Sequence, residues 1–292
     1  MDSNKFVDED GFITVEYKGK KSIKCVIPPE LQAQCQQLET TNGVFDEKKF
    51  ESMVEDVRNS NFFMNFKENM LCALKNLDRN VESDSHENFI QNVETLSMNN
   101  NKMLDIVCYG LGNFASCLAA RYQLAFLINL KKILLPRNIC IFDPMFSYEE
   151  KRVLKNFGLT VLKENEEGKR TVLNRTIFFM PHCSIVLYNN LLWANWGKDS
   201  LSKLIIIGNS LQGYFDGWTE NFFELEAVYI NYASKFVTEA KIVNNFKFLD
   251  VFNTSSLHYF HIDALNEVSV KIWNDNIEPI YDDIETLKNG YF

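Results

Sequence analysis

The segment that decides the fold reads Asp105-Ile106-Val107-Cys108-Tyr109-Gly110-Leu111-Gly112-Asn113-Phe114-Ala115. Its apolar run ends in the pattern Gly-x-Gly-x-x-Ala, and an amphipathic segment follows at once. This is typical of a buried strand that turns tightly into a helix in a mononucleotide-binding unit. The first glycine permits the turn, the second lets a ligand approach the backbone, and the small third residue lets helix and strand pack closely. The helix N-terminus would then offer N–H groups and a positive dipole end to an anion.

Composition places the chain among ordinary globular proteins. Its 292 residues, 46% of them apolar, are enough for one large domain or two modest ones with a sizeable core. The net charge of -9 argues against a broad nucleic-acid surface, which needs clustered lysine and arginine. The seven cysteines include no Cys-x-x-Cys pair, so we expect no metal site, and an odd count fits a reducing compartment.

The chain carries no pattern of a membrane span or of an export signal. It begins with the polar residues Met1-Asp2-Ser3-Asn4, and its most apolar stretch, residues 118–135, contains Arg121 and two lysines. We therefore expect a protein without membrane contact, located in the cytoplasm, with the nucleus as a second location.

From Met103 onward, short β-rich runs alternate with helical patterns, as in βαβ units around a parallel sheet. The runs are almost continuously hydrophobic, which predicts strands buried on both faces. We predict an α/β fold, a Rossmann-like three-layer sandwich with a mostly parallel sheet. Expected strands are 105–109, 139–142, 160–163, 176–180 and 204–207, with further candidates at 228–232, 250–253 and 257–261. Expected helices are 113–134, 148–156, 185–195 and 222–225.

The first 95 residues have a different pattern. Alternation over 12–17 and again over 23–27, with a turn at 18–21, predicts a short β-hairpin. Helical patterns follow at 30–39, 47–59, 62–77 and 87–98. We therefore divide the chain into an N-terminal β-hairpin with a helical appendage (1–95), a Rossmann-like domain (96–265) and an acidic C-terminal tail (266–292).

The five main expected strands, from 105–109 to 204–207, are each followed by polar residues or glycine. Ligands of open parallel sheets bind beyond the carboxyl ends of the strands, so these ends should converge on one cleft. We expect the cleft to hold a nucleotide-like ligand. The candidate ligand-binding residues are Gly110, Gly112, Asn113, Asp143, Glu164, His182, Asn209 and Ser210.

Two of these positions have alternative interpretations. Asp143 follows the second strand, where a ribose-binding acid belongs, but an Asp-Pro pair also caps a turn before a helix. His182 could act as a general acid–base or contact a ligand. Its neighbour Cys183 could be a nucleophile or a buried structural cysteine, and the second role is the commoner one for cysteine.

The segment 188–196 is unusually rich in amide and aromatic side chains for a crossover helix. These residues could line a pocket by stacking and hydrogen bonding. Alternatively, the leucines form a packing face that the tryptophans join. The charge run 164–170 is typical of a solvated loop. His258 and His261 lie in an aromatic run that predicts packing.

Several ordered blocks resemble the sensitivity-to-red-light-reduced family. They are Val107-Cys108-Tyr109-Gly110-Leu111-Gly112-Asn113-Phe114, Ala120-Arg121-Tyr122-Gln123-Leu124-Ala125, Phe142-Asp143-Pro144, Leu162-Lys163-Glu164-Asn165-Glu166-Glu167-Gly168, Met180-Pro181-His182-Cys183, Leu187-Tyr188-Asn189-Asn190-Leu191-Leu192-Trp193-Ala194-Asn195-Trp196, Ile207-Gly208-Asn209-Ser210 and Phe252-Asn253-Thr254-Ser255-Ser256-Leu257-His258. A weaker similarity begins at Asp10-Gly11-Phe12.

The resemblance implies a regulatory protein of a circadian-clock input pathway that affects clock-gene expression and haem biosynthesis. It implies no reaction, no cofactor and no catalytic residues. Two alternatives stay open: a Rossmann-fold enzyme such as an S-adenosylmethionine-type transferase, and a protein-interaction module with a vestigial cleft. Fold alone does not choose among the three. The protein partners are not identified by the sequence.

Overall fold

The computed structural model describes residues 45–77, 104–217, 220–274 and 276–281, together with three short strands near the N-terminus. A seven-stranded sheet in the order β6-β5-β4-β7-β8-β10-β9 forms its centre. The strands are β4 (Asp105–Tyr109), β5 (Asn138–Phe142), β6 (Thr160–Val161), β7 (Thr176–Met180), β8 (Leu204–Asn209), β9 (Thr238–Lys241) and β10 (Ser255–Tyr259). The first five strands pair in parallel, and β10 lies antiparallel between β8 and β9.

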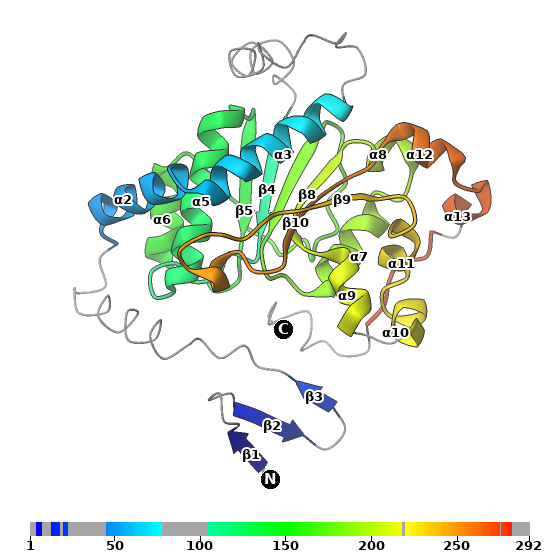
Figure 1. Ribbon diagram of the computed structural model, residues 1–292, viewed down its shortest axis with the longest axis horizontal. Helices are drawn as coiled ribbons and strands as arrows, with labels where there is room; N and C mark the ends of the chain where they lie inside the picture. Colours follow the sequence, from blue (N-terminus) through cyan, green and yellow to red (C-terminus); the bar gives the residue numbers. More distant parts are fainter. Residues whose placement is uncertain are drawn as a thin grey trace.

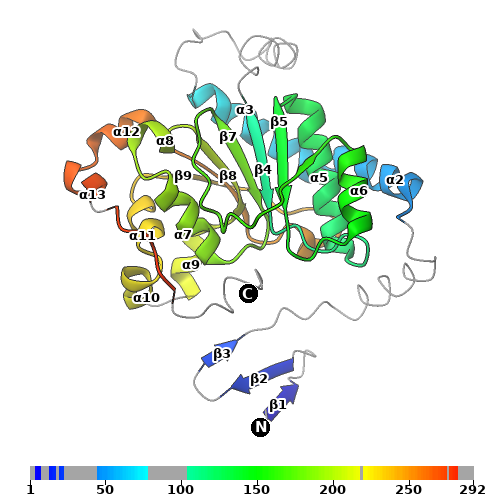
Figure 2. The ribbon, with the colours of Figure 1, turned by 180° about the vertical axis from the view of Figure 1, so that it is seen from behind.

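Helices cover both faces of this sheet, which confirms the predicted three-layer sandwich. On one face, α2 (Glu47–Arg58), α3 (Asn61–Leu77), α5 (Leu118–Leu134) and α6 (Tyr148–Asn156) pack in one hydrophobic cluster with the sheet. On the other face, a second cluster holds α7 (Ile185–Ala194), α8 (Lys198–Leu201), α11 (Val228–Ala233) and α12 (Ile262–Glu267). Figure 1 shows α2 and α3 crossing one side of the sheet, and Figure 2 shows α7 from the other side.

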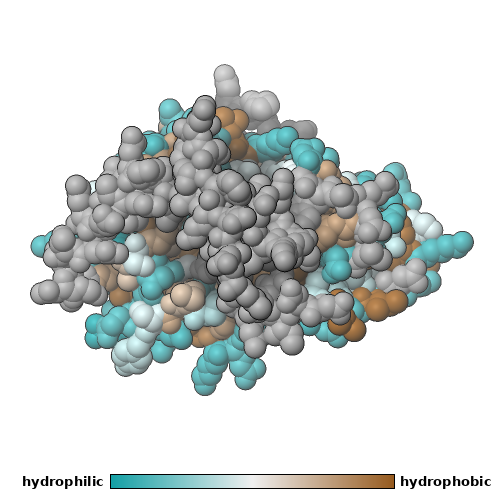
Figure 3. Space-filling model, turned by 90° about the horizontal axis from the view of Figure 1, so that it is seen from below, coloured by the Kyte–Doolittle hydropathy of each residue, from teal (hydrophilic) through white to brown (hydrophobic). Residues whose placement is uncertain are grey.

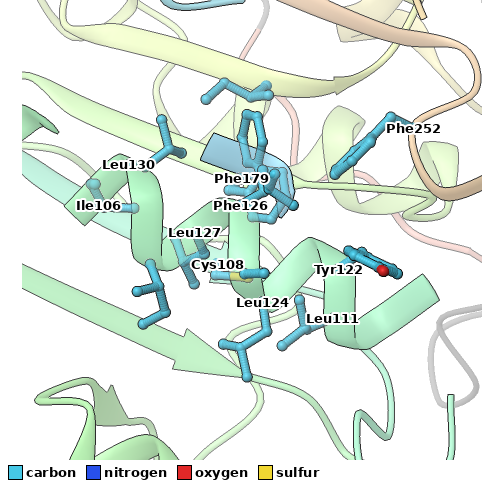
Figure 4. Close-up of a cluster of buried hydrophobic side chains, with 14 of the residues drawn as sticks. Ile106, Cys108, Leu111, Tyr122, Leu124, Phe126, Leu127, Leu130, Phe179 and Phe252 are labelled. Atoms are coloured by element: carbon cyan, nitrogen blue, oxygen red, sulfur yellow. The ribbon is translucent and has the colours of Figure 1, made fainter. Parts of the chain in front are cut away.

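The first cluster is built around aromatic rings from distant parts of the sequence (Figure 4). Phe126 on α5 stacks on Phe179 of β7 with ring centroids 5.2 Å apart, and Phe62 of α3 stacks on Phe252 at 4.4 Å. Each such pair contributes about 0.5–1.5 kcal/mol beyond the area it buries. These contacts fix α3, α5 and the loop before β10 against the carboxyl half of the sheet.

The parallel strands and their helices lie close to the predicted positions, but two predicted strands are wrong. Residues 228–232 belong to helix α11, in which Tyr229, Ile230 and Ala233 are buried on one face. This apolar run is short enough to satisfy either period. Residues 250–253 enter a 3-10 helix (Leu249–Val251), not a strand.

Helix α5 begins at Leu118, five residues later than the predicted start at 113. The delay arises because the Asn113 side chain accepts hydrogen bonds from the Ser116 N–H and hydroxyl, both at 3.0 Å, and so stabilises a turn. The short elements α9 (Leu211–Gly217), α10 (Glu220–Leu225) and α13 (Val270–Asn274) complete the described chain.

Near the N-terminus, β1 (Asn4–Val7), β2 (Ile13–Tyr17) and β3 (Lys20–Ser22) form an antiparallel sheet, in which β2 matches the first strand of the predicted hairpin and pairs with β3. Its second strand begins at Lys20, within the predicted turn. Helices α2 and α3 also match their predictions. The predicted segments 23–27, 30–39 and 87–98 lie outside the described residues, and the domain boundaries stay predictions.

Candidate functional site

The glycine turn after β4 has the predicted conformation. Gly110 and Gly112 have φ angles of +68° and +80°, in the left-handed region that favours glycine. A Cβ atom on Gly110 would lie 2.5 Å from the Sγ atom of Cys183, so the turn also packs directly against the loop after β7. The turn follows β4 directly, so it lies at the carboxyl edge of the sheet. Figure 3 views the molecule from this edge, where hydrophilic and hydrophobic residues intermix on the described surface.

The carboxylate of Asp143 occupies this turn. Its Oδ2 accepts a hydrogen bond from the Gly112 N–H at 2.7 Å, and its Oδ1 accepts one from the Met145 N–H at 2.8 Å. The side chain is buried, which raises its pKa, and the two N–H donors offset only part of that effect. The Gly112 N–H, which the sequence pattern predicted to bind a ligand, therefore donates to Asp143 instead.

A second carboxylate binds the next part of the same loop. Glu150 Oε1 accepts from the Ala115 N–H at 2.8 Å, while Oε2 accepts from the Ser147 N–H at 2.8 Å. Ser147 and Glu150 together form the capping box of α6, so Glu150 serves its own helix and the glycine loop at once. On the opposite side, Arg121 binds the carbonyl oxygens of Phe114 and Ala115.

His182, from the loop after β7, is held by the chain on two sides. Its backbone N–H donates to Asn209 Oδ1 at 3.0 Å, and its ring Nε2 lies 3.2 Å from the carbonyl oxygen of Val251. Burial lowers the pKa of the imidazole, although the carbonyls of Val251 and Asp250 oppose the shift. A neutral ring donates its Nε2–H to Val251, whose carbonyl also accepts from the Gln123 side chain at 3.0 Å.

Asn209, at the end of β8, forms hydrogen bonds with several polar groups from neighbouring loops and helices. Its Nδ2 donates to the Tyr214 hydroxyl at 2.8 Å and to the Cys183 carbonyl at 3.2 Å. Its N–H donates to the Tyr188 hydroxyl at 2.8 Å, and that hydroxyl donates to the Met180 carbonyl. Cys183 donates its thiol to the Tyr109 carbonyl at 3.2 Å, and burial raises its pKa. A buried, protonated thiol has the properties of a structural cysteine, not of a nucleophile.

Ser210 is bonded to the carboxylate of Glu239, which is a weak base because its pKa is low. Its hydroxyl lies 2.5 Å from Glu239 Oε1 and accepts from the Gly213 N–H at 2.9 Å. Burial alone would raise the pKa of Glu239, but His258, Ser210 and the Gln212 N–H together lower it to about 2. The buried His258 contacts Glu239 Oε2 at 3.4 Å and the Leu211 N–H at 3.3 Å. These two contacts are alternatives, since Nε2 accepts only when it carries no hydrogen and donates only when it carries one.

Glu164, in contrast, is exposed, and no hydrogen bond or ion pair given by the structure joins it to the other candidates. The acid that reaches the end of β4 is Glu166, which was not predicted. It accepts from the Tyr109 hydroxyl and binds Arg170 through two hydrogen bonds of 2.8 Å. Although burial opposes the change, Arg170 and Tyr109 lower the pKa of Glu166. Residues 166–170 are not helical, so their spacing in the sequence gave no signal of this pair.

The amide side chains of α7, and of Asn195 directly after it, form hydrogen bonds with neighbouring segments of the chain. Asn195 accepts from the Val172 N–H at 2.9 Å and donates to the Arg170 carbonyl at 2.8 Å. Asn189 accepts from the N–H groups of Tyr229 and Ile230 at 2.9 and 3.3 Å, at the start of α11. The amide-rich helix thus stabilises its neighbours.

The part of the chain that the structure describes contains neither a metal-binding cluster nor a membrane-spanning helix. It contains no cluster of three or more histidine, cysteine, aspartate or glutamate side chains that could hold a metal ion. Within the same described ranges, no helix is long and apolar enough to span a bilayer.

Segments of this chain are similar in sequence to known proteins. An SRR1-like protein of Mus musculus is 59% identical over 110 residues, which are 37% of this chain and 44% of the relative. The protein Sensitivity to Red Light Reduced 1 of Arabidopsis thaliana is 34% identical over 180 residues (59% and 64%), and an SRR1-like protein of Drosophila melanogaster is 31% identical over 160 residues (55% and 56%). The matched segments therefore span about half the length of these relatives.

Two solved methyltransferases have a similar fold at very low identity. A putative caffeoyl-CoA O-methyltransferase from Staphylococcus aureus is 10% identical, with a TM-score of 0.31, covering 74% of this chain and 99% of that one. The plantazolicin methyltransferase BpumL is 12% identical, with a TM-score of 0.30, covering 80% and 96%. The model of the SRR1 domain matches residues 74–259, which is more than half of the chain. The chain belongs to the SRR1 domain family.

Proposed function

We propose that this chain is a regulatory protein of a light- or clock-signalling pathway that works by binding other proteins. The name of its Arabidopsis thaliana relative supports the pathway. The finer parts of the proposal are that it affects clock-gene expression and haem biosynthesis, and that it acts in the cytoplasm and the nucleus. In this account the Rossmann-like domain is a scaffold, and its glycine loop is a structural element.

The closure of the glycine loop by Asp143 is the observation that carries this proposal. A nucleotide-binding turn leaves its backbone N–H groups to a phosphate or to another anion. Here the N–H groups of Gly112 and Ala115 are bonded to Asp143 and Glu150, so an anionic ligand would have to displace two carboxylates of the chain. The backbone N–H of His182 also donates to a side chain of the protein, that of Asn209.

Thermal denaturation with candidate ligands tests the proposal. ATP, NAD, S-adenosylmethionine and haem are each added to the full chain over a range reaching millimolar concentration. A ligand present at a hundredfold excess over its Kd would stabilise the fold by about 2.7 kcal/mol. That corresponds to a rise in Tm of about 5 °C or more. We expect no rise with any of the four, and a saturable rise with one of them would overturn the closed-loop proposal.

The regulatory part of the proposal needs a separate measurement. Removal of the protein from its source organism should change the period or the light response of a clock-gene reporter. Return of the wild-type chain should restore it. An unchanged reporter would reject the regulatory role, whatever the ligand experiment shows.

A second candidate is an S-adenosylmethionine-type transferase, and the glycine turn with its neighbouring acid favours it. Asp143 also follows β5 next to the glycine turn, where a ribose-binding acid belongs. For this candidate, Asp143 would have to release Gly112 and turn toward the ligand. A Tm rise with S-adenosylmethionine that is lost in Asp143→Ala would support it.

A further inference from the structure

Residues 276–281, here called the C-terminal strap, lie across the surface formed by α7, α11 and the loop after β6 (Figure 2). Hydrogen bonds to Ile277, Glu278 and Tyr281 hold the strap. The Tyr229 hydroxyl donates to the Ile277 carbonyl at 2.6 Å, and Lys169 Nζ lies 2.7 Å from a carboxylate oxygen of Glu278. The Tyr281 hydroxyl accepts from Asn189 Nδ2 at 2.8 Å and donates to Asn190 Oδ1 at 3.2 Å.

The residues that receive the strap are fixed by other contacts. Asn189 accepts from the first N–H groups of α11, so its amide orientation is set without the strap. Asn190 donates to the Glu167 carbonyl at 2.8 Å, and Lys169 lies 3.3 Å from the Glu167 carboxylate. The receiving surface is therefore preorganised, which reduces the entropic cost of binding an extended segment.

The strap itself contributes little apolar burial. Ile277 and Ile280 are 77% and 86% exposed, while the ring of Tyr281 packs against the second hydrophobic cluster. Pro279 favours an extended backbone at Glu278, which keeps the segment in a binding conformation. A segment held by a few hydrogen bonds, one ion pair and one ring can exchange with a competitor, because each of these contacts is individually weak.

We propose that this surface is a peptide-binding site that the chain's own strap occupies. Its external ligand would be an extended segment of a partner protein with an acidic residue followed three residues later by tyrosine. Lys169 binds the acid, the amides of Asn189 and Asn190 bind the tyrosine hydroxyl, and Tyr229 binds a backbone carbonyl. The inference rests on the proposed function, because it names the kind of protein that the chain would bind. The strap would compete with that protein for the same surface.

Fluorescence polarisation with a labelled peptide of residues 275–283 tests the inference on the full chain. A tethered strap competes at an effective concentration in the millimolar range. The wild-type chain should therefore bind the peptide at least tenfold more weakly than a Glu278→Ala, Tyr281→Ala chain, whose strap is released. A peptide with phenylalanine in place of Tyr281 is the matched control, and it should bind at least fivefold more weakly than the parent peptide.

A charge exchange identifies the receiving surface. In the strap-released chain, Lys169→Glu should reduce binding at least tenfold, and a peptide with lysine at position 278 should recover most of the loss. Lys198→Glu, on α8, is the control for surface charge and should leave binding unchanged.

Three results would overturn the inference: equal binding by the wild-type and strap-released chains, no binding by either, or binding that is insensitive to Lys169→Glu. A ligand-induced rise in Tm would reject the closed glycine loop and leave this inference standing. Failure of the peptide experiment would leave the closed loop intact.

Discussion

Replacement of Asp143 by alanine should destabilise the folded chain because two backbone donors lose their acceptor. The N–H groups of Gly112 and Met145 donate to its carboxylate at 2.7 and 2.8 Å. Each buried donor left without a partner costs about 1–3 kcal/mol. Removing a carboxylate whose burial is itself unfavourable offsets part of this cost. We therefore expect a net loss of about 2–4 kcal/mol in the free energy of unfolding, and a fall in Tm of about 4–8 °C.

Urea denaturation is the assay, because an unchanged slope with a lower midpoint reports a change in stability alone. The loss should depend on pH in a defined direction. Burial raises the folded-state pKa of Asp143 above its unfolded value of about 3.9. Its titration therefore contributes stability that is fully present below pH 4 and is lost as the pH rises through the folded-state pKa. The effect of Asp143→Ala should be largest at low pH and should shrink as the pH rises.

Two results would refute this reasoning. A loss below about 0.5 kcal/mol, the scatter of ordinary surface substitutions, would mean that the glycine loop does not depend on Asp143. An effect that grows with pH would mean that the carboxylate is stabilised by its surroundings. Glu149→Ala is a suitable control, since this exposed acid pairs with Arg152 on the surface of α6.

Three further predictions follow from contacts at the same edge of the sheet. The folded-state pKa of Glu239 is about 2, so its contribution to stability is present above its unfolded pKa of about 4.3 and is lost as the pH falls toward 2. Glu239→Gln should therefore make the free energy of unfolding less dependent on pH between about 4.3 and 2, and an unchanged pH dependence would contradict this. Gly110→Ala should lower the free energy of unfolding by about 2 kcal/mol or more, since it combines a left-handed φ with a Cβ atom 2.5 Å from Cys183 Sγ. In a double-mutant cycle, adding Cys183→Ala should recover part of this loss. In thiol labelling of the folded chain, exposed Cys72 should react rapidly while Cys183 reacts only on unfolding; rapid labelling of Cys183 would reject its buried, protonated state.

The sequence predicted the central strands well because of where they lie. Strands β4 and β7 are buried on both faces, so nearly every residue is apolar and the runs stand out from their surroundings. Strand β9 was missed, since this short edge strand, Thr-Glu-Ala-Lys, carries no such pattern. Helix α11 was assigned as a strand because its six residues are apolar enough to fit both periods.

The candidate site was predicted in part. The glycine turn follows from local conformation, and it lies where the pattern indicated. What occupies the turn could not be predicted, because the Asp143 carboxylate reaches Gly112 across 31 positions of sequence. The choice of Glu164 over Glu166 failed to identify the acid bonded to Tyr109, since the two acids lie in one irregular loop whose side-chain directions no simple period fixes. Asn189 and Asn190 of α7 and the following Asn195 were recognised as unusual, but their partners lie in other segments of the chain.

The most direct measurement of the central claim is the behaviour of the Gly112 backbone amide in solution, observed by NMR. If the Asp143 carboxylate closes the glycine loop, this amide exchanges slowly with solvent in the wild-type chain and rapidly in Asp143→Ala. Its resonance also stays in place when nucleotides or S-adenosylmethionine are added at millimolar concentration. A rapidly exchanging Gly112 amide in the wild-type chain, or a resonance that moves saturably with one of these ligands, would contradict the account.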